Sequence, residues 1–225
     1  MFAGHLGVAF AAKVVEPKAP LGALVAASFG IDLIWPILLL GGIESVSIAP
    51  EATAFTPLSF DSYPWSHSLA MVLVWGGLAG IGVRLLGMSK RVAVVIAAVV
   101  VSHWILDFVT HRPDLPLWPG GPEFGLGLWN SVAGTFLVEG VLFLGAAALY
   151  ARTFQTNDPI GRAGFPALLG LVTVIWIAGP FSPPPPSESA VAAVGLALWI
   201  LPVWAWRIDA RRGGARVAES DEPAP

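Results

Sequence analysis

The stretch that decides this fold reads Ser102-His103-Trp104-Ile105-Leu106-Asp107-Phe108-Val109-Thr110-His111, at the end of an apolar run that begins at Val92. His103, Asp107 and His111 are spaced by four residues, so a helix places all three on one face. Ionisable side chains are costly inside an apolar membrane helix, and they indicate a functional site there. Neutral imidazoles with a carboxylate are typical ligands of zinc or a similar divalent ion. The alternative is a structural polar network between packed helices.

The composition is that of a membrane protein. Of the 225 residues, 56% are hydrophobic and 12% are charged, and the mean hydropathy is +0.74. Neither a Gly-rich phosphate loop nor a basic face is evident, so we expect no nucleic-acid partner. Cysteine is absent, which restricts any metal site to His, Asp and Glu ligands, and the chain has four histidines.

Long apolar runs predict the architecture, because a membrane span needs about 20 such residues. We predict an all-α fold, a polytopic membrane bundle of six transmembrane helices plus a short N-terminal apolar helix. The six runs cover residues 21–41, 66–86, 92–109, 131–150, 165–181 and 190–206, and the short helix covers residues 2–15. Whether residues 1–15 span the membrane or lie on its surface stays open.

The chain is predicted to contain three parts. Residues 1–150 form a helical bundle with the metal site, and residues 151–210 add two transmembrane helices. Residues 211–225 are charged and rich in small residues, which predicts a disordered cytoplasmic tail.

Loop charges predict the orientation. Basic residues lie before the first run, between the second and third, between the fourth and fifth, and after the sixth, whereas the other loops carry only Arg112. By the positive-inside rule the basic loops are cytoplasmic. We therefore predict a multi-pass protein of the cytoplasmic (inner) membrane with a cytoplasmic C-terminus. The basic residues are Lys13, Lys18, Arg84, Lys90, Arg91, Arg152, Arg162, Arg207, Arg211, Arg212 and Arg216.

This topology brings ionisable residues from five segments to a similar depth in the outer half of the bilayer. Asp32 is predicted about 15 Å, and Glu139 about 12 Å, below the outer ends of their spans. The full set is His5, Asp32, His67, His103, Asp107, His111 and Glu139.

Several members of this set are also compatible with roles that need no metal. His67 is compatible with an interfacial cap, His5 with a snorkelling side chain and His111 with a solvated interfacial one. Glu139 is interpreted as a protonated helix–helix hydrogen-bond partner, a ligand of a second metal or a general base. Asp61 and Asp114 are interpreted as ordinary loop residues.

Four of these motifs resemble a known family. Gly4-His5-Leu6-Gly7, the segment around Asp32, Trp65-Ser66-His67-Ser68 and His103-Trp104-Ile105-Leu106-Asp107 resemble the membrane-bound metal-dependent hydrolases of bacterial and archaeal inner membranes. Their order is also similar to that of the all-helical zinc-dependent phospholipase C and single-strand nuclease group, which has a trinuclear zinc site. The resemblance covers about residues 1–140 and implies that His5, Asp32, His67, His103 and Asp107 bind metal, with His111 and Glu139 completing a second site. This sequence departs from the pattern in two ways. The family usually has a second acidic residue near Asp32, and the soluble enzymes have an additional histidine late in the sequence, and both are missing here. One or two ions are therefore expected rather than three.

Together these observations predict an integral-membrane metal-dependent hydrolase of phosphoester or lipid-type substrates, with zinc, or alternatively manganese, as its ion. The predicted metal ligands are His5, Asp32, His67, His103, Asp107 and His111, and Asp32 or Glu139 is the predicted proton acceptor. Membrane lipids and an amphiphilic or lipid-linked substrate are the expected partners. The alternatives are a metal or proton transport protein, and a non-catalytic accessory subunit with a structural metal.

Overall fold

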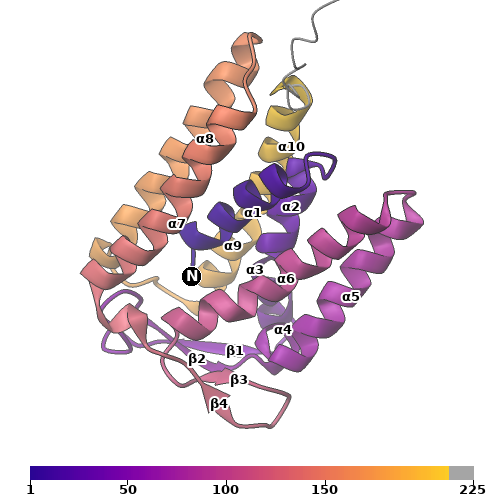
Figure 1. Cartoon of the computed structure of the whole chain (residues 1–225). Coiled ribbons are helices and arrows are strands. Elements are labelled where there is room, and N and C mark those ends of the chain that lie inside the picture. The colour runs from indigo at the N-terminus through magenta and orange to yellow at the C-terminus, as the bar shows by residue number, and fades with distance from the viewer. Residues whose placement is uncertain (213–225) are drawn as a thin grey trace, which may run out of the picture.

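The computed structural model describes residues 1–212 and is mostly helical (Figure 1). The helices are α1 (Ala3–Val15), α2 (Leu21–Ser28), α3 (Gly30–Leu40), α4 (Pro64–His67), α5 (Leu69–Leu85), α6 (Lys90–Thr110), α7 (Val132–Thr153), α8 (Pro159–Ala178), α9 (Glu188–Ala197) and α10 (Ile200–Arg212), with short 3-10 turns η1 (Leu128–Asn130) and η2 (Gly179–Phe181). Two small antiparallel pairs complete the fold: β1 (Ser45–Ile48) with β2 (Leu58–Ser62), and β3 (Leu115–Pro116) with β4 (Glu123–Phe124). The all-α class is thereby confirmed, and the strands lie between the apolar runs from which the helices were predicted.

The N-terminal helix α1 lies inside the bundle rather than on its surface. Leu6 and Phe10 are fully buried, and Phe10 packs against the rings of Phe143, Tyr150 and Phe165 on α7 and α8. At Gly7 the two backbones approach closely, because a Cβ there would lie 2.7 Å from the carbonyl oxygen of Leu142. The helix that carries His5 is therefore the one around which its neighbours pack.

Helices α2 and α3 form one bent pair, with an angle of 53° between them. Phe29 lies at the break and Gly30, a poor helix former, follows it. At this break the carbonyl oxygen of Ser28 accepts a hydrogen bond from His103 Nδ1 at 2.8 Å. The bend therefore brings the start of α3, with Asp32, beside α6.

Helices of membrane-spanning length are present, but the six predicted spans are not confirmed. Within residues 1–212, four helices are long and apolar enough, and the bent α2–α3 pair would add a fifth. Helix α5, predicted as a span, has 17 residues and falls among the shorter apolar helices. The four are Lys90–Thr110, Val132–Thr153, Pro159–Phe181 and Glu188–Arg212.

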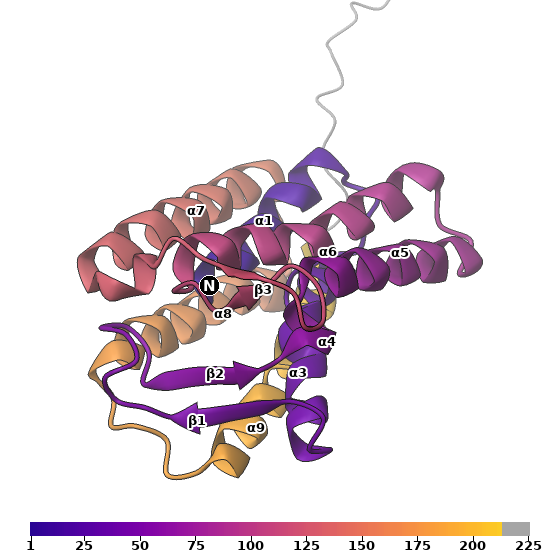
Figure 2. The same cartoon turned by 90° about the horizontal axis from the view of Figure 1, so that it is seen from below.

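The two ends of the bundle differ. The strands lie at one end, which Figure 2 shows from below, with the β1–β2 hairpin beside α3, α4 and α9. The connections between α1 and α2, α5 and α6, and α7 and α8, which contain or adjoin basic residues, lie at the other end (Figure 1). There Arg91 pairs with Glu16 at 2.7 Å and Lys13 with Asp209 at 2.9 Å. We call these three connections the basic connections. Loops that the sequence predicts on one side of the membrane thus gather at one end of the molecule.

One hydrophobic cluster includes residues from both predicted helical parts of the chain. Phe165 and Leu168 of α8 and Leu201 of α10 belong to the same buried cluster as Leu6 of α1. Helix α10 continues through Arg212, two residues into the predicted tail. The rest of that tail, residues 213–225, lies outside the described residues.

Candidate metal centre

Asp107 lies at the centre of the site. His103 and Asp107 are one helical turn apart on α6, and their side chains are 0% and 2% exposed. His103 Nε2 lies 3.0 Å from Asp107 Oδ2. The spacing of four residues therefore produces the predicted pair, and the surrounding helices remove it from solvent.

The other three histidines of the chain also reach this carboxylate. His5 Nε2, from α1, lies 3.1 Å from Asp107 Oδ1. His67 Nε2, from α4, lies 3.9 Å from Asp107 Oδ2, and His111 Nε2, at the end of α6, lies 4.0 Å from it. All four imidazoles of the sequence thus converge on one carboxylate.

Asp32 adds a second carboxylate beside the first. Its Oδ1 lies 3.5 Å from His67 Nε2 and 3.7 Å from His103 Nε2. Its side chain is 24% exposed, whereas the four histidines and Asp107 are buried. Two groups with ligand atoms within 4.8 Å of one another result, and they share His103: one is His5, His103 and Asp107, and the other is Asp32, His67 and His103.

Hydrogen bonds on the far side of three imidazoles fix which nitrogen carries the proton. His103 Nδ1 donates to the Ser28 carbonyl oxygen, and His111 Nδ1 donates to Asp114 Oδ1 at 3.0 Å. His67 Nδ1 lies 2.7 Å from Ser66 Oγ, whose own hydroxyl donates to Glu44 Oε2 at 2.6 Å. The Ser66 oxygen is therefore the acceptor for His67.

Because Nδ1 is the donor in each ring, a neutral imidazole presents the lone pair of Nε2 to the centre. Outer hydrogen bonds of this kind are typical of metal-binding histidines.

The contact between His103 and Asp107 indicates a cation. With its proton on Nδ1, His103 turns the acceptor Nε2 toward a carboxylate oxygen 3.0 Å away. Two acceptors at this distance repel unless a proton or a metal ion lies between them. His103 Nε2 is accordingly a buried atom without a hydrogen-bond partner in the described part of the chain.

The donor set fits a divalent metal ion. Imidazole nitrogens with carboxylate oxygens suit zinc and manganese, and the chain supplies no thiolate. The amino group of Met1 contacts Asp107 Oδ1, which leaves Oδ2, the oxygen nearest to His67, His103 and His111, to meet an ion. The rings of His5 and His103 are stacked, with centroids 3.8 Å apart, so α1 and α6 present their imidazoles side by side.

Glu139 lies beside the centre and holds α1. Its Oε2 accepts hydrogen bonds from the backbone N–H groups of Phe2 and Gly4 at 3.0 and 3.2 Å. These groups belong to the first turn of the helix that carries His5, where a carboxylate is favoured. Oε1 is buried and has no hydrogen-bond partner among the described residues. The predicted roles of Glu139 as a proton acceptor and second-metal ligand stay predictions.

The outer rim of the site contains Tyr63, His111 and Asp114. Burial lowers the pKa of His111, which favours the neutral imidazole. Burial alone would raise the pKa of Asp114, but hydrogen bonds with His111, Arg112 and Tyr63 outweigh it and lower that pKa. Burial, together with the charge of Asp114, raises the pKa of Tyr63 well above its ordinary value. The rim therefore holds a carboxylate, a neutral phenol and a neutral imidazole at neutral pH.

Sequence reasoning missed the residues that hold the histidines. Asp114, interpreted as an ordinary loop residue, is buried and bonded to His111. Glu44 is buried too, and its Oε1 accepts from the backbone N–H groups of Trp65 and Ser66, both at 2.8 Å. Their loops carry no periodic pattern. Asp114 could have been suspected because it follows the predicted ligand His111 by three residues, whereas Glu44 is distant in sequence from the histidine that it helps to hold. Asp61 is exposed and bonds Ser47, as expected of a loop residue.

All six predicted ligands thus gather at this centre, brought together by four helices, α1, α3, α4 and α6. No family model, curated protein or solved structure matches this chain.

Proposed function

We propose that this chain is an integral-membrane, metal-dependent hydrolase of phosphoester or lipid-type substrates. The observation that carries the proposal is the convergence of four imidazoles on Asp107, two of which also lie beside Asp32, with His103 Nε2 3.0 Å from Asp107 Oδ2. A polar packing network would be expected to pair donors with acceptors, whereas a metal site collects acceptors.

The ligand roles follow from the two groups. His103 and Asp107 hold the ion, with His5 on one side and His67 and Asp32 on the other. One or two ions are proposed, zinc first and manganese second, and His111 completes the set. A bound ion supplies Lewis-acid chemistry, because it polarises a phosphoryl or carbonyl oxygen and makes water a stronger acid.

Asp32 is the best placed proton acceptor in this proposal. It is the most exposed member of the set, at 24%, so water and substrate reach it more easily than they reach Asp107. Ser28 orients His103, and Glu44 orients His67 through Ser66. Both act from the side of the imidazole that faces away from the ion, so neither faces the substrate. A site with one accessible side is expected of a catalytic metal, whereas a structural metal is enclosed by protein ligands.

The placement in the membrane is part of the proposal. The metal centre lies toward the strand end, and the basic connections lie at the opposite end. With the basic end facing the cytoplasm, the centre lies in the outer half of a cytoplasmic membrane and the C-terminus is cytoplasmic. An amphiphilic substrate can reach such a depth from the bilayer itself.

Hydrolysis by metal-loaded protein tests the proposal. The full chain, in detergent with zinc or manganese, is incubated with phospholipids and with soluble nitrophenyl phosphate mono- and diesters. We expect hydrolysis by the wild type and by Asp61→Asn, an exposed carboxylate control, and none by His103→Ala. Asp32→Asn should keep most of its metal and lose activity.

Full metal occupancy without hydrolysis of any substrate would contradict the enzymatic role. Zinc flux into liposomes would then support the transport alternative, and its absence would support a structural metal.

A further inference from the structure

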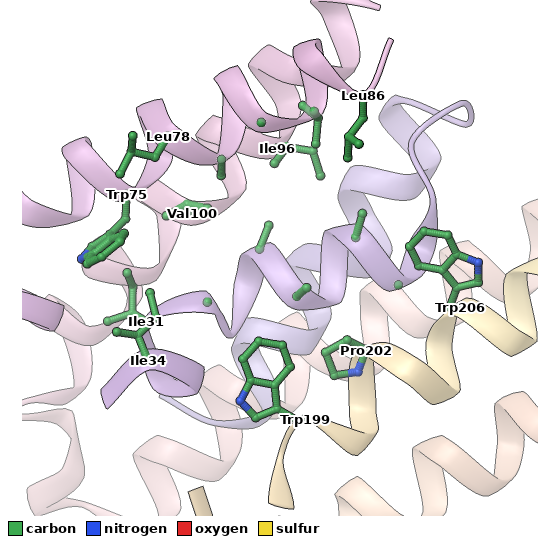
Figure 3. Close-up of a pocket in the computed structure, with 18 of the residues that line it drawn as sticks. Ile31, Ile34, Trp75, Leu78, Leu86, Ile96, Val100, Trp199, Pro202 and Trp206 are labelled. Carbon is green, nitrogen blue, oxygen red and sulfur yellow. The ribbon is translucent and has the colours of Figure 1, made fainter. Parts of the chain in front are cut away.

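A large apolar cavity, open to the outside, is bordered by α2, α3, α5, α6 and α10 (Figure 3). Its volume is about 810 Å³, within the range typical of ligand sites. Small residues such as Ala23, Ala26 and Gly82 give it width, and Trp75, Trp199 and Trp206 provide flat walls. Arg207 is the one charged residue in its described lining. The interior therefore accepts hydrocarbon and offers almost nothing to a polar group.

The cavity is lined by candidate membrane spans. Ile96 and Val100 belong to the candidate span Lys90–Thr110, and Pro202 belongs to the candidate span Glu188–Arg212. The floor between them is the bent α2–α3 pair, the candidate fifth span. Its surroundings are therefore lipid, and lipid is the molecule that has direct access to it.

One end of the cavity is built by the elements that carry the metal centre. Ile31 lines the cavity and precedes Asp32, and Val100 lines it one turn before His103. Trp75, a third lining residue, donates from Nε1 to the Trp65 carbonyl oxygen at 2.9 Å, on the short helix that carries His67.

Figure 3 shows Ile31, Ile34 and Trp75 at this end and Leu86 and Trp206 at the other. The elements that carry Asp32, His67 and His103 therefore also border the near end of the cavity.

We propose that this cavity binds one acyl chain of a phospholipid, with the phosphoester at the Asp32 end. Hydrolysis of the bound lipid rests on the proposed hydrolase function, whereas binding of the lipid does not. Helices α2 and α3 extend at most about 18 Å between Gly22 and Ile34, enough for most of an acyl chain.

Because membrane lipid is already in an apolar medium, the chain gains packing contacts rather than hydrophobic energy on entering. Selectivity therefore depends on the phosphoester at the metal end.

Two glycines of α5 provide a matched pair of variants. A Cβ at Gly82 meets no heavy atom within 4 Å, and Gly82 lines the cavity, so the side chain of Gly82→Leu starts in open space and is expected to extend into the cavity. A Cβ at Gly77 also meets nothing within 4 Å, but Gly77 is exposed and outside the lining. Gly77→Leu thus places the same side chain on the same helix and leaves the cavity open. Neither residue belongs to the metal centre.

Photolabelling tests the proposal independently of catalysis. The full chain is placed in nanodiscs of phosphatidylethanolamine and phosphatidylglycerol, the latter carrying a diazirine on one acyl chain, then irradiated, and labelled peptides are mapped. We expect labelling concentrated on cavity residues in the wild type and in Gly77→Leu. In Gly82→Leu, labelling of those residues falls about tenfold, as when a bulky side chain fills a pocket. Metal content should be equal in all three proteins.

Labelling spread evenly over the lipid-facing helices, or equal in the two variants, would overturn the proposal. So would a chemically cross-linked dimer whose interface covers Trp75 and Trp206, because a second copy would then be the occupant. Cavity labelling without any lipid hydrolysis supports the binding site and counts against the hydrolase. Phospholipid hydrolysis that is equal in Gly82→Leu and Gly77→Leu supports the hydrolase and counts against the binding site.

Discussion

Replacing Glu44 by glutamine tests how His67 is held for a metal ion. The Glu44 carboxylate accepts from the Ser66 hydroxyl at 2.6 Å, which leaves the Ser66 oxygen to accept from His67 Nδ1 at 2.7 Å. Glutamine keeps one oxygen for the backbone N–H groups of Trp65 and Ser66 but puts an amide donor in place of the other oxygen. The Ser66 hydroxyl must then donate elsewhere, and His67 Nδ1 is the nearest acceptor.

That reversal moves the imidazole proton to Nε2, the atom that faces Asp32 and Asp107. His67 can then no longer offer a lone pair to the ion. Loss of such an outer hydrogen bond typically weakens metal binding by about 10- to 100-fold, or about 1.4 to 2.7 kcal/mol. We expect a loss in this range, because three histidines and two carboxylates remain.

The assay is a competition titration of zinc between the detergent-solubilised protein and a chromogenic chelator. Asp61→Asn makes the same chemical change at an exposed carboxylate and should bind zinc as the wild type does. Circular dichroism verifies that both variants are folded. Zinc affinity of Glu44→Gln equal to that of Asp61→Asn would refute the assigned tautomer or the participation of His67.

Other variants test the packing that supports the site, each by thermal unfolding in detergent. Asp114→Ala removes the acceptor of His111, Arg112 and Tyr63 and should cost about 1–3 kcal/mol; an unchanged melting temperature would show that the rim is not structural. Gly7→Ala forces α1 away from Leu142 and should cost about 1–3 kcal/mol while weakening zinc binding through His5. Gly77→Ala, with no atom nearby, should instead stabilise the protein by about 0.5–1 kcal/mol, and similar melting curves for the two glycine variants would contradict the close approach. Asp209→Ala leaves Lys13 Nζ and the Leu21 N–H without this acceptor and should cost about 1–3 kcal/mol; stability equal to the wild type would make that contact incidental.

The part of the site that lies within one helix was predictable from the sequence. A helix of known pitch places His103, Asp107 and His111 on one face, and the structure has all three there. The cost of an ionisable group among apolar residues also marked Asp32 and Glu139 as unusual. Both rules act along a single element, so no knowledge of the packing was needed.

What depends on packing between elements was not predictable. The bend at Phe29 brings Ser28 to His103, and nothing in the apolar run shows which carbonyl that imidazole will meet. Helix α1 has 13 residues, too few to suggest a central position, yet Gly7 lets it approach α7 closely enough to be buried. Glu44 lies 22 residues before Ser66 and meets it only because the β1–β2 hairpin folds back. The number of spans was not predictable either, because the apolar run at residues 66–86 does not show where its helix begins and ends. Helix α5 has only 17 residues and therefore falls among the shorter apolar helices.

The central claim is that the carboxylate of Asp107, surrounded by four imidazoles, binds a metal ion. Elemental mass spectrometry of the purified, detergent-solubilised protein, beside Asp107→Asn and the exposed control Asp61→Asn, measures this directly. We predict stoichiometric zinc or manganese in the wild type and in Asp61→Asn, and almost none in Asp107→Asn. A folded wild-type protein without bound metal, even after incubation with zinc and manganese, would contradict the claim. The His103–Asp107 contact would then be a buried ion pair with a protonated imidazole.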